Sequence, residues 1–158
     1  MASFAELNDN HKVLRVVIVG NDIPTSSGPL GENDMHVDGE AWCTKFFKGG
    51  TWKQTSYSGS FRKQFAGPGH LYDESLDMFI ISKPYPDFIL NASGDWEAPN
   101  GMATPTGAQE QYPNPDDSSA PYLFSDLTWN SEDSKWEASR LNTDQVRVQW
   151  NGSTWDEV

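Results

Sequence analysis

Four short stretches of this chain share one pattern, and no other feature constrains the fold as strongly. Each has a large apolar residue, then Asp or Asn, a polar turn, and a second large apolar residue. The four stretches are Tyr72–Phe79, Leu90–Trp96, Trp129–Trp136 and Trp150–Trp155. The pattern predicts small β-hairpins whose two large side chains face each other across the strands. It therefore indicates that most of the tryptophans stabilise the fold by packing across strands and do not take part in a reaction.

The turn residues support this interpretation. Pairing Trp150 with Trp155 leaves a two-residue Gly-Ser loop, which is a recognised tight-hairpin signal. Pairing Leu90 with Trp96 leaves a three-residue loop that ends in Gly94, where a left-handed residue closes the turn. The Asp or Asn after the first apolar residue is expected to hydrogen-bond the turn backbone. Facing aromatic pairs contribute only about 0.2–1 kcal/mol each, so the hairpins must also pack on something else.

Two further elements are predicted near the start of the chain. Phe4–Leu7 and the β-branched run Val13–Val19 flank a polar turn and predict an opening hairpin. Residues 35–48 are the best helix candidate, because Gly49-Gly50 follows and an apolar set recurs at helical spacing. That set is Met35, Gly39, Trp42, Cys43 and Phe46. Gly39 weakens the helix prediction, since glycine is a poor helix former.

The remaining segments complete a predicted order of elements. Residues 51–56 are expected to turn at 57–60 and to pair with 61–65, and Lys83–Asp87 is predicted to be an extended connector. The fold class is α+β, mostly antiparallel β, with an N-terminal sheet and one helix followed by serial short β-hairpins. The predicted boundaries are 1–82 for an N-terminal α+β domain, 83–98 for an extended connector and hairpin, 99–121 for a Pro-rich linker or long loop, and 122–158 for C-terminal Trp-clamped β-hairpins.

Charge is distributed unevenly along the chain. Residues 1–70 hold seven acidic and seven basic side chains, whereas residues 71–158 hold sixteen acidic and four basic ones, so the back half carries the whole net charge of −12. Such a surface repels nucleic acid and anionic membranes, and we expect neither as a partner. One interpretation is a solvated surface; another is a neutral half that docks on a partner while the acidic half faces outward. We expect synthesis in a host cytoplasm, because the start has no secretory pattern.

The search for catalytic patterns finds little. His11, His36 and His70 are isolated, and Cys43 lies on the predicted core face of the helix. No phosphate-binding loop or hydrolase motif occurs. Acidic pairs sit in turns, where a glycosidase pair or a calcium site remains an alternative, although no twelve-residue calcium loop is present. We predict a chain that is not an enzyme and has no cofactor and no metal.

Seven residues are candidates for partner binding. The tryptophans could stack on sugar rings, or they could pack on each other or on a neighbouring chain, which the cross-strand pairing favours. The basic residues could form a weak patch for an acidic partner. The candidates are Trp129, Trp136, Trp150, Trp155, Lys53, Arg62 and Lys63.

A group of segments in the front of the chain carries a resemblance. Phe61-Arg62-Lys63, Tyr72-Asp73 and Lys83-Pro84-Tyr85-Pro86 occur in this order, after an opening Met-Ala-Ser-Phe-Ala-Glu-Leu. Roughly residues 1–99 resemble a family of small proteins from marine tailed phages, especially those of cyanobacteria. His70-Leu71 and Phe88 depart from that pattern at packing positions. The resemblance implies a virion component or virion-associated protein, and it carries over no catalytic residues.

The sequence therefore favours a non-enzymatic phage virion structural protein, most of all one for capsid decoration or stabilisation. Its partners would be other virion proteins of the capsid or of the neck and tail, and it would be present in many copies on the particle. The alternative is a tail- or neck-associated adhesin for host-surface polysaccharide that uses exposed tryptophans. A third hypothesis is a cytoplasmic phage accessory protein or a disguised enzyme.

Overall fold

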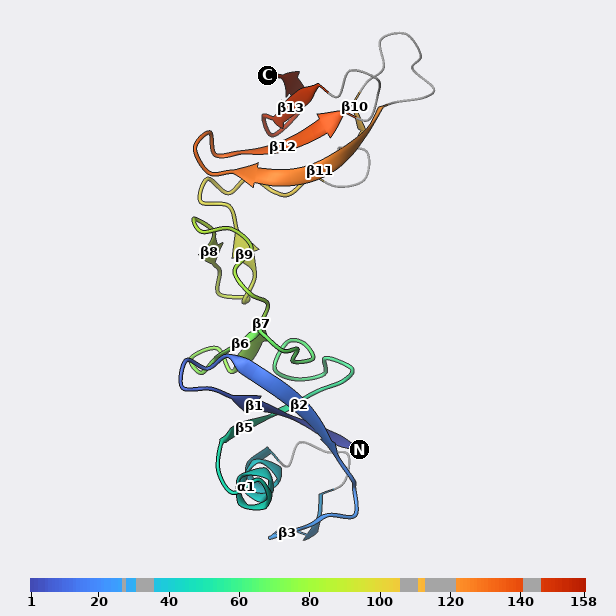
Figure 1. Cartoon of the computed structure of the whole chain (residues 1–158), viewed down its shortest axis with the longest axis vertical. Coiled ribbons are helices and arrows are strands. Elements are labelled where there is room, and N and C mark those ends of the chain that lie inside the picture. The colour runs from blue at the N-terminus through green and yellow to red at the C-terminus, as the bar shows by residue number, and fades with distance from the viewer. Residues whose placement is uncertain (27, 31–35, 106–110, 113–121, 141–145) are drawn as a thin grey trace. The chain divides into compact units, whose positions relative to one another are not determined.

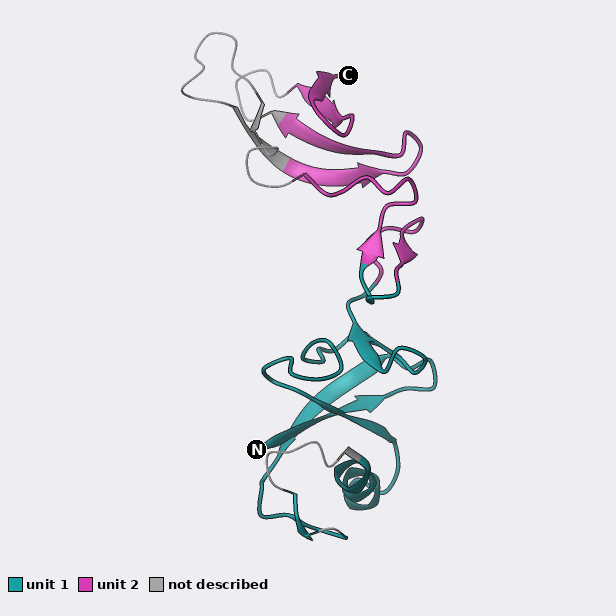
Figure 2. Cartoon of the chain, turned by 180° about the vertical axis from the view of Figure 1, so that it is seen from behind, with its two compact units in different colours: residues 1–82, 92–95 teal, residues 83–91, 96–158 magenta. Residues whose placement is uncertain are grey.

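The computed structural model describes residues 1–26, 28–30, 36–105, 111–112, 122–140 and 146–158. One helix and many antiparallel strands in small sheets make up this part of the chain, which confirms the predicted α+β, mostly β, class (Figure 1). The residues cluster into two compact units, each described by itself below (Figure 2). Unit 1 comprises Met1–Ser82 and Ala92–Asp95, and unit 2 comprises Lys83–Asn91 and Trp96–Val158.

Unit 1 is built on a three-stranded antiparallel sheet in the order β2-β1-β5. Its elements are β1 (Ala2–Leu7), β2 (Val13–Val19), β3 (Pro24–Thr25), β4 (Gly28–Pro29), α1 (His36–Phe46), β5 (Thr51–Thr55), β6 (Leu71–Asp73) and β7 (Met78–Ile80). The opening hairpin is confirmed, with Phe4 opposite Val17 and a bulge near the turn. The turn itself is held by the Asn8 side chain, which accepts hydrogen bonds from two backbone amides of the loop.

The predicted hairpin between residues 51–56 and 61–65 is wrong. Strand β5 pairs with β1 instead, and residues 61–65 form no strand. Arg62 and Lys63 adopt positive φ angles of 53° and 68°, which are incompatible with an extended strand. The Thr55 hydroxyl accepts a hydrogen bond from the backbone amide of Ala66, so a side chain ties this segment to β5 where a strand ladder was expected.

Helix α1 confirms most of the predicted 35–48 helix, although Met35 lies outside the described residues. A Cβ on Gly39 would stand 2.2 Å from Cζ of Phe4, so glycine is required here by the close approach of the buried Phe4 ring. Phe46 was assigned to the core face, and this is wrong. It is 62% exposed and its ring stacks on Trp42, while Phe47 packs against the core instead.

The two faces of the sheet bury different sets of side chains. On one face Phe4 and Trp52 pack against Cys43 of α1. On the other face Ala5 and Leu7 pack against Ala66, in the loop between β5 and β6, and against Tyr72 and Phe79 of the β6–β7 hairpin. The alternation of side chains along β1 therefore places a core on each side of one sheet.

Unit 2 contains a five-stranded antiparallel sheet in the order β10-β11-β12-β13-β14. Its elements are β8 (Ile89–Leu90), β9 (Trp96–Glu97), β10 (Gln111–Tyr112), β11 (Tyr122–Asn130), β12 (Lys135–Arg140), β13 (Arg147–Trp150) and β14 (Trp155–Glu157). Strand β10 falls inside the predicted linker 99–121 and pairs with β11, so that segment is not wholly a linker. The parts of it at 106–110 and 113–121 lie outside the described residues.

All four predicted hairpin registers are confirmed. Tyr72 faces Phe79 and Leu90 faces Trp96; the two tryptophan pairs follow the predicted register as well. In three turns the first Asp or Asn accepts hydrogen bonds from two turn amides, as predicted. Gly94 and Gly152 take the left-handed conformation that the short loops require, with φ of 75° and 100°.

The predicted connector at Lys83–Asp87 is only partly extended. The backbone amide of Phe88 donates to the carbonyl of Tyr85 at 3.2 Å, so a turn interrupts the segment. This turn places Tyr85 and Phe88 against the aromatic core of unit 2. Among the described residues, the structure has no helix with the length and apolar content needed to cross a lipid bilayer.

Candidate functional site

The four C-terminal tryptophans form one continuous row across four strands. Trp136 pairs with Trp129 on one side and with Trp150 on the other, and Trp150 then pairs with Trp155. All four are buried, with exposed fractions of 4–7%. Phe88 covers this row, and its ring packs edge-on against Trp129 and Trp136. The prediction that these rings bind a partner is therefore corrected: they form the core of unit 2 and present almost no surface.

The three predicted basic candidates are also engaged inside unit 1. The Arg62 side chain is 7% exposed and pairs with two carboxylates. Lys63 pairs with Asp95 and donates to the carbonyl of Ser93. The Lys53 ammonium lies 5.0 Å from the centre of the Tyr72 ring. The structure brings these three residues to one region of the fold, but their charges are directed at internal partners rather than at a free basic patch.

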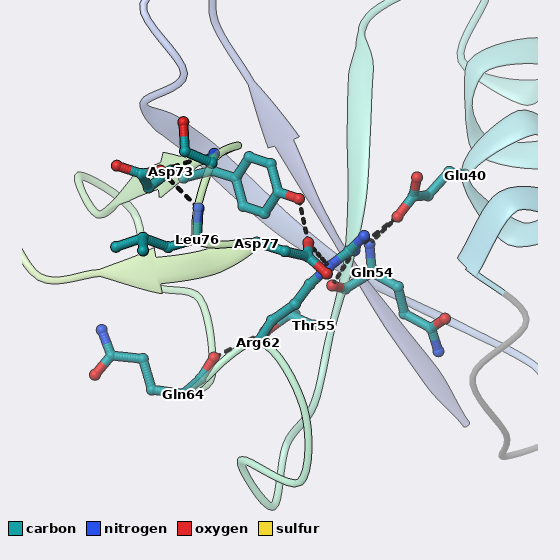
Figure 3. A network of polar contacts seen from close by, with 10 residues as sticks. Glu40, Gln54, Thr55, Arg62, Gln64, Asp73, Leu76 and Asp77 are labelled. Carbon is teal, nitrogen blue, oxygen red and sulfur yellow. Dashed lines mark hydrogen bonds and ion pairs between the residues drawn. The ribbon is translucent and has the colours of Figure 1, made fainter. Parts of the chain in front are cut away.

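Arg62 joins three elements of unit 1 (Figure 3). Its guanidinium donates to Glu40 of α1 at 2.7 Å and to the backbone carbonyl of Gln54 on β5 at 2.9 Å. It also donates to Asp77, in the β6–β7 turn, at 2.7 Å. Glu40 in turn accepts from the backbone amide of Gln54. These contacts fix the helix, the sheet and the hairpin relative to one another, which is a structural role.

Two groups of unit 1 that could act as nucleophiles are held in their neutral forms. Burial, with a hydrogen bond to Asp77, raises the pKa of the Tyr72 phenol, although the nearby Arg62 acts in the opposite direction. Burial raises the pKa of the Cys43 thiol to about 12, with Glu40 as a second cause. Both side chains are therefore protonated near neutral pH. The thiolate, which is the reactive form of cysteine, is disfavoured at this position.

A second polar network lies on the side of the unit 2 sheet away from the tryptophan row. Glu137 accepts hydrogen bonds from Gln149 at 2.8 Å, from Asn130 at 2.7 Å and from Arg147 at 2.8 Å. Gln149 is buried and also donates to Asp133. These donors, above all Gln149 and then Asn130, lower the pKa of Glu137 to about 2. Strands β11, β12 and β13 are therefore joined by side chains as well as by their backbones.

This network predicts a loss of stability in acid. The folded pKa of Glu137 is about 2 and its ordinary value is 4.5. The carboxylate therefore stabilises the fold fully above about pH 4.5, and this contribution disappears as pH falls towards about 2. The difference corresponds to about 3 kcal/mol at most. Urea unfolding at pH 6 and pH 3 checks this, with Glu137→Gln as the reference variant.

The measured quantity is the difference in unfolding free energy between the two proteins, because other carboxylates titrate in the same range. We expect the natural chain to be the more stable one at pH 6 and the gap to narrow by about half at pH 3, which lies between the folded pKa and the ordinary one. A gap that does not depend on pH would contradict the assigned role of the Glu137 carboxylate.

The outer face of α1 is the most distinctive exposed surface of unit 1. Val37 is 79% exposed, Ala41 and Lys45 are exposed one and two helical turns further on, and Lys48 is exposed just after the helix ends at Phe46. We refer to these four residues as the α1 outer face. It combines apolar side chains with positive charge in a chain whose net charge is −12. Sequence reasoning missed it, because the helical pattern was interpreted only for its buried side.

Other residues that hold the structure together had no local signal in the sequence. Glu40, Asp77, Glu137 and Gln149 matter because of partners that lie 12–22 positions away. Of the three histidines, His70 accepts from the amide of Gly67, and the side chain of His36 lies outside the described part of the chain. Within the described residues, no group of three or more His, Cys, Asp or Glu side chains could hold a metal ion.

Comparison with known proteins gives no relative for this chain. No family model, no curated protein and no solved structure matches it. The resemblance of residues 1–99 to phage proteins therefore stays a hypothesis, and any function must be argued from the molecule itself.

Proposed function

We propose that this chain is a non-enzymatic structural protein of a phage particle, which attaches to the capsid and decorates or stabilises it. The sequence resemblance of the front half supports the assignment to a particle. The structure supports a scaffold role, because the aromatic and basic side chains that were candidates for partner binding make packing contacts and ion pairs within the fold. Two cores in unit 1 and a third in unit 2 suit a protein that must persist on a particle surface.

The observation that carries the proposed mode of attachment is the α1 outer face. Its apolar side chains, Val37 and Ala41, gain by leaving water, and Lys45 and Lys48 beside them favour a partner surface of negative charge. An acidic, partly apolar patch on the capsid protein is thus the complementary surface. Repetition of this site by capsid symmetry would place many copies on each particle.

Unit 2 is proposed to face outward. Residues 83–91 and 96–158 contain twelve acidic and four basic side chains, a net charge of −8, against −4 for unit 1. A strongly acidic surface remains solvated and repels nucleic acid and anionic membranes. Repulsion between like charges disfavours contact of unit 2 with an acidic capsid patch, so the α1 outer face is the proposed contact.

The alternative of a tail or neck adhesin that binds polysaccharide through its tryptophans is less well supported. Its basis was the exposure of Trp129, Trp136, Trp150 and Trp155, and these rings are buried. Copy number separates the two readings, because a neck or tail offers far fewer equivalent positions than a capsid.

Quantitative mass spectrometry of purified particles of the encoding phage tests the proposal. We expect the chain in every preparation, at on the order of hundreds of copies per particle, because closed symmetry repeats each capsid site. About a dozen copies would indicate the neck or tail instead. Absence from the particles would contradict any structural role.

The attachment surface is tested by a charge reversal. Phage that carry Lys45→Glu together with Lys48→Glu are expected to incorporate far less of the chain than the parent phage. Lys12→Glu is the matched control, because Lys12 is also exposed but lies in the β1–β2 turn, outside the α1 outer face. Equal incorporation of both variants would show that the attachment does not use this face.

A further inference from the structure

One end of the sheet face opposite α1 is left uncovered and forms a groove. Cross-strand neighbours Ile18, Ser3 and Thr55 form a row at this end, and Ile18 is 66% exposed. The next row, centred on Ala5, is covered by the β6–β7 hairpin and the segment before it. The groove has a volume of about 370 Å³. Its lining consists of Met1, Ala2, Ser3, Gln54, Thr55, Ser56, Tyr57, Ser58, Ser60 and Phe61.

The lining is polar and contains no charged side chain. Six of the ten lining residues carry a hydroxyl group, and one carries an amide. Charged residues make up 22% of the whole chain, so a lining whose side chains are all uncharged is a distinctive feature of this surface. Hydroxyl and amide groups both donate and accept hydrogen bonds, which suits a ligand rich in hydroxyls. No lining side chain is charged, and the charged group nearest to this lining is the α-amino group of Met1.

A serine-rich turn holds one aromatic ring at the edge of the groove. The Ser56 hydroxyl accepts from the backbone amide of Ser60 at 3.0 Å, and it contacts the hydroxyls of Ser58 and Ser60. The amide of Gly59 donates to the carbonyl of Ser56, which closes the turn. Tyr57 stands on this turn and is 87% exposed. Its ring is therefore presented to solvent by a backbone that is fixed internally.

The Tyr57 ring is also held from the side. It meets the ring of Phe65 edge-on, with ring centres 5.5 Å apart and planes at 72°. A large, exposed aromatic ring offers contact area at low entropic cost, because its side chain has few rotamers to lose on binding. The electron-rich face of such a ring attracts the weakly positive C–H groups of an apolar ligand face.

We propose that this groove binds a neutral sugar, with Tyr57 as the stacking surface and the serine hydroxyls as hydrogen-bonding groups. A pyranose ring combines an apolar C–H face with a rim of hydroxyls, and the groove has a complementary element for each. The volume is at the small end of ligand pockets, which suits a short segment of a glycan. Sugar binding was an alternative for the tryptophans, and the proposed site lies in a different part of the chain.

Titration calorimetry on the full chain tests the proposal with maltohexaose, cellohexaose and mannohexaose as neutral probes and oligogalacturonate as a charged one. We expect at least one neutral probe to bind and the charged probe not to bind. Tyr57→Ala should weaken binding about tenfold, and Tyr57→Phe should keep it within about twofold. Ile89→Ala, an exposed residue of β8 outside the groove lining, is the control and should bind as the natural chain does.

Because Tyr57 is exposed, we expect its substitution to leave the fold intact, and the thermal transition of each variant checks this. Three results would overturn the proposal: no heat from any neutral probe up to about 10 mM, binding of the charged probe alone, or equal affinity of Tyr57→Ala and the natural chain. The virion proposal would survive each of them, because it uses the α1 outer face.

Discussion

Replacement of Trp136 by alanine is expected to destabilise unit 2 by about 3–5 kcal/mol, the usual cost of truncating a large buried aromatic side chain. Trp136 is 4% exposed and lies in the middle of the cross-strand row, between Trp129 and Trp150. Its ring also contacts Tyr85 and Phe88 of the preceding segment. The truncation therefore opens a cavity where two parts of unit 2 meet. A small unit has a total stability on the order of 5 kcal/mol, so much of it would unfold.

Hydrogen exchange measured by mass spectrometry resolves this effect by segment. Peptides from β11–β13 should lose protection in Trp136→Ala, while peptides from β1 and β5 should not, because unit 1 has separate cores. Trp136→Phe is the matched control. It keeps an aromatic ring and removes an indole N–H that has no hydrogen-bond partner among the described residues, so we expect less than about half the alanine cost. Similar losses in both variants would contradict the cavity explanation.

The hairpins were predictable because their information is local. In each case the turn residues fix the loop length, and the loop length fixes the register; the pairing of Tyr72 with Phe79 and of Trp150 with Trp155 follows from adjacent residues alone. The link between Trp136 and Trp150 did not follow in the same way. It depends on how β12 meets β13 across residues that contain no tight-turn signal.

The wrong predictions concern contacts between residues that lie far apart in the sequence. Residues 51–56 alternate only loosely and were expected to pair with the segment after the next turn, yet β5 joins β1, a partner nearly fifty positions earlier. Local pattern cannot rank two possible partners for a short strand, because the difference lies in the packing of both faces of the final sheet. The predicted partner-binding residues turned out to make internal contacts for a related reason. Tryptophan and arginine are typical of binding surfaces and also of internal contacts, and only burial distinguishes the two roles.

Arg62 provides the second large expected effect. Arg62→Met keeps much of the side-chain volume and removes the charge, which leaves Glu40 without its partner in a largely buried position. Breaking one half of a buried ion pair costs about 3–5 kcal/mol. We expect about 3 kcal/mol, the lower end, because Asp77 is 60% exposed and its pairing is screened by solvent. Urea unfolding of the full chain, with hydrogen exchange in α1 and β5 to identify unit 1, measures the loss.

A double variant separates the ion pair from simple packing. If the cost of Arg62→Met comes from the uncompensated carboxylate, then adding Glu40→Gln should recover about half of it or more, since no isolated charge remains. Lys63→Met is the control for an exposed pair: its partner Asp95 is 61% exposed, so the expected cost is about 0–1 kcal/mol. An Arg62→Met cost as small as that of Lys63→Met would mean that the helix, the sheet and the hairpin of unit 1 are held by their apolar cores alone. A large cost that Glu40→Gln fails to relieve would instead assign the effect to the hydrogen bond that Arg62 donates to the carbonyl of Gln54.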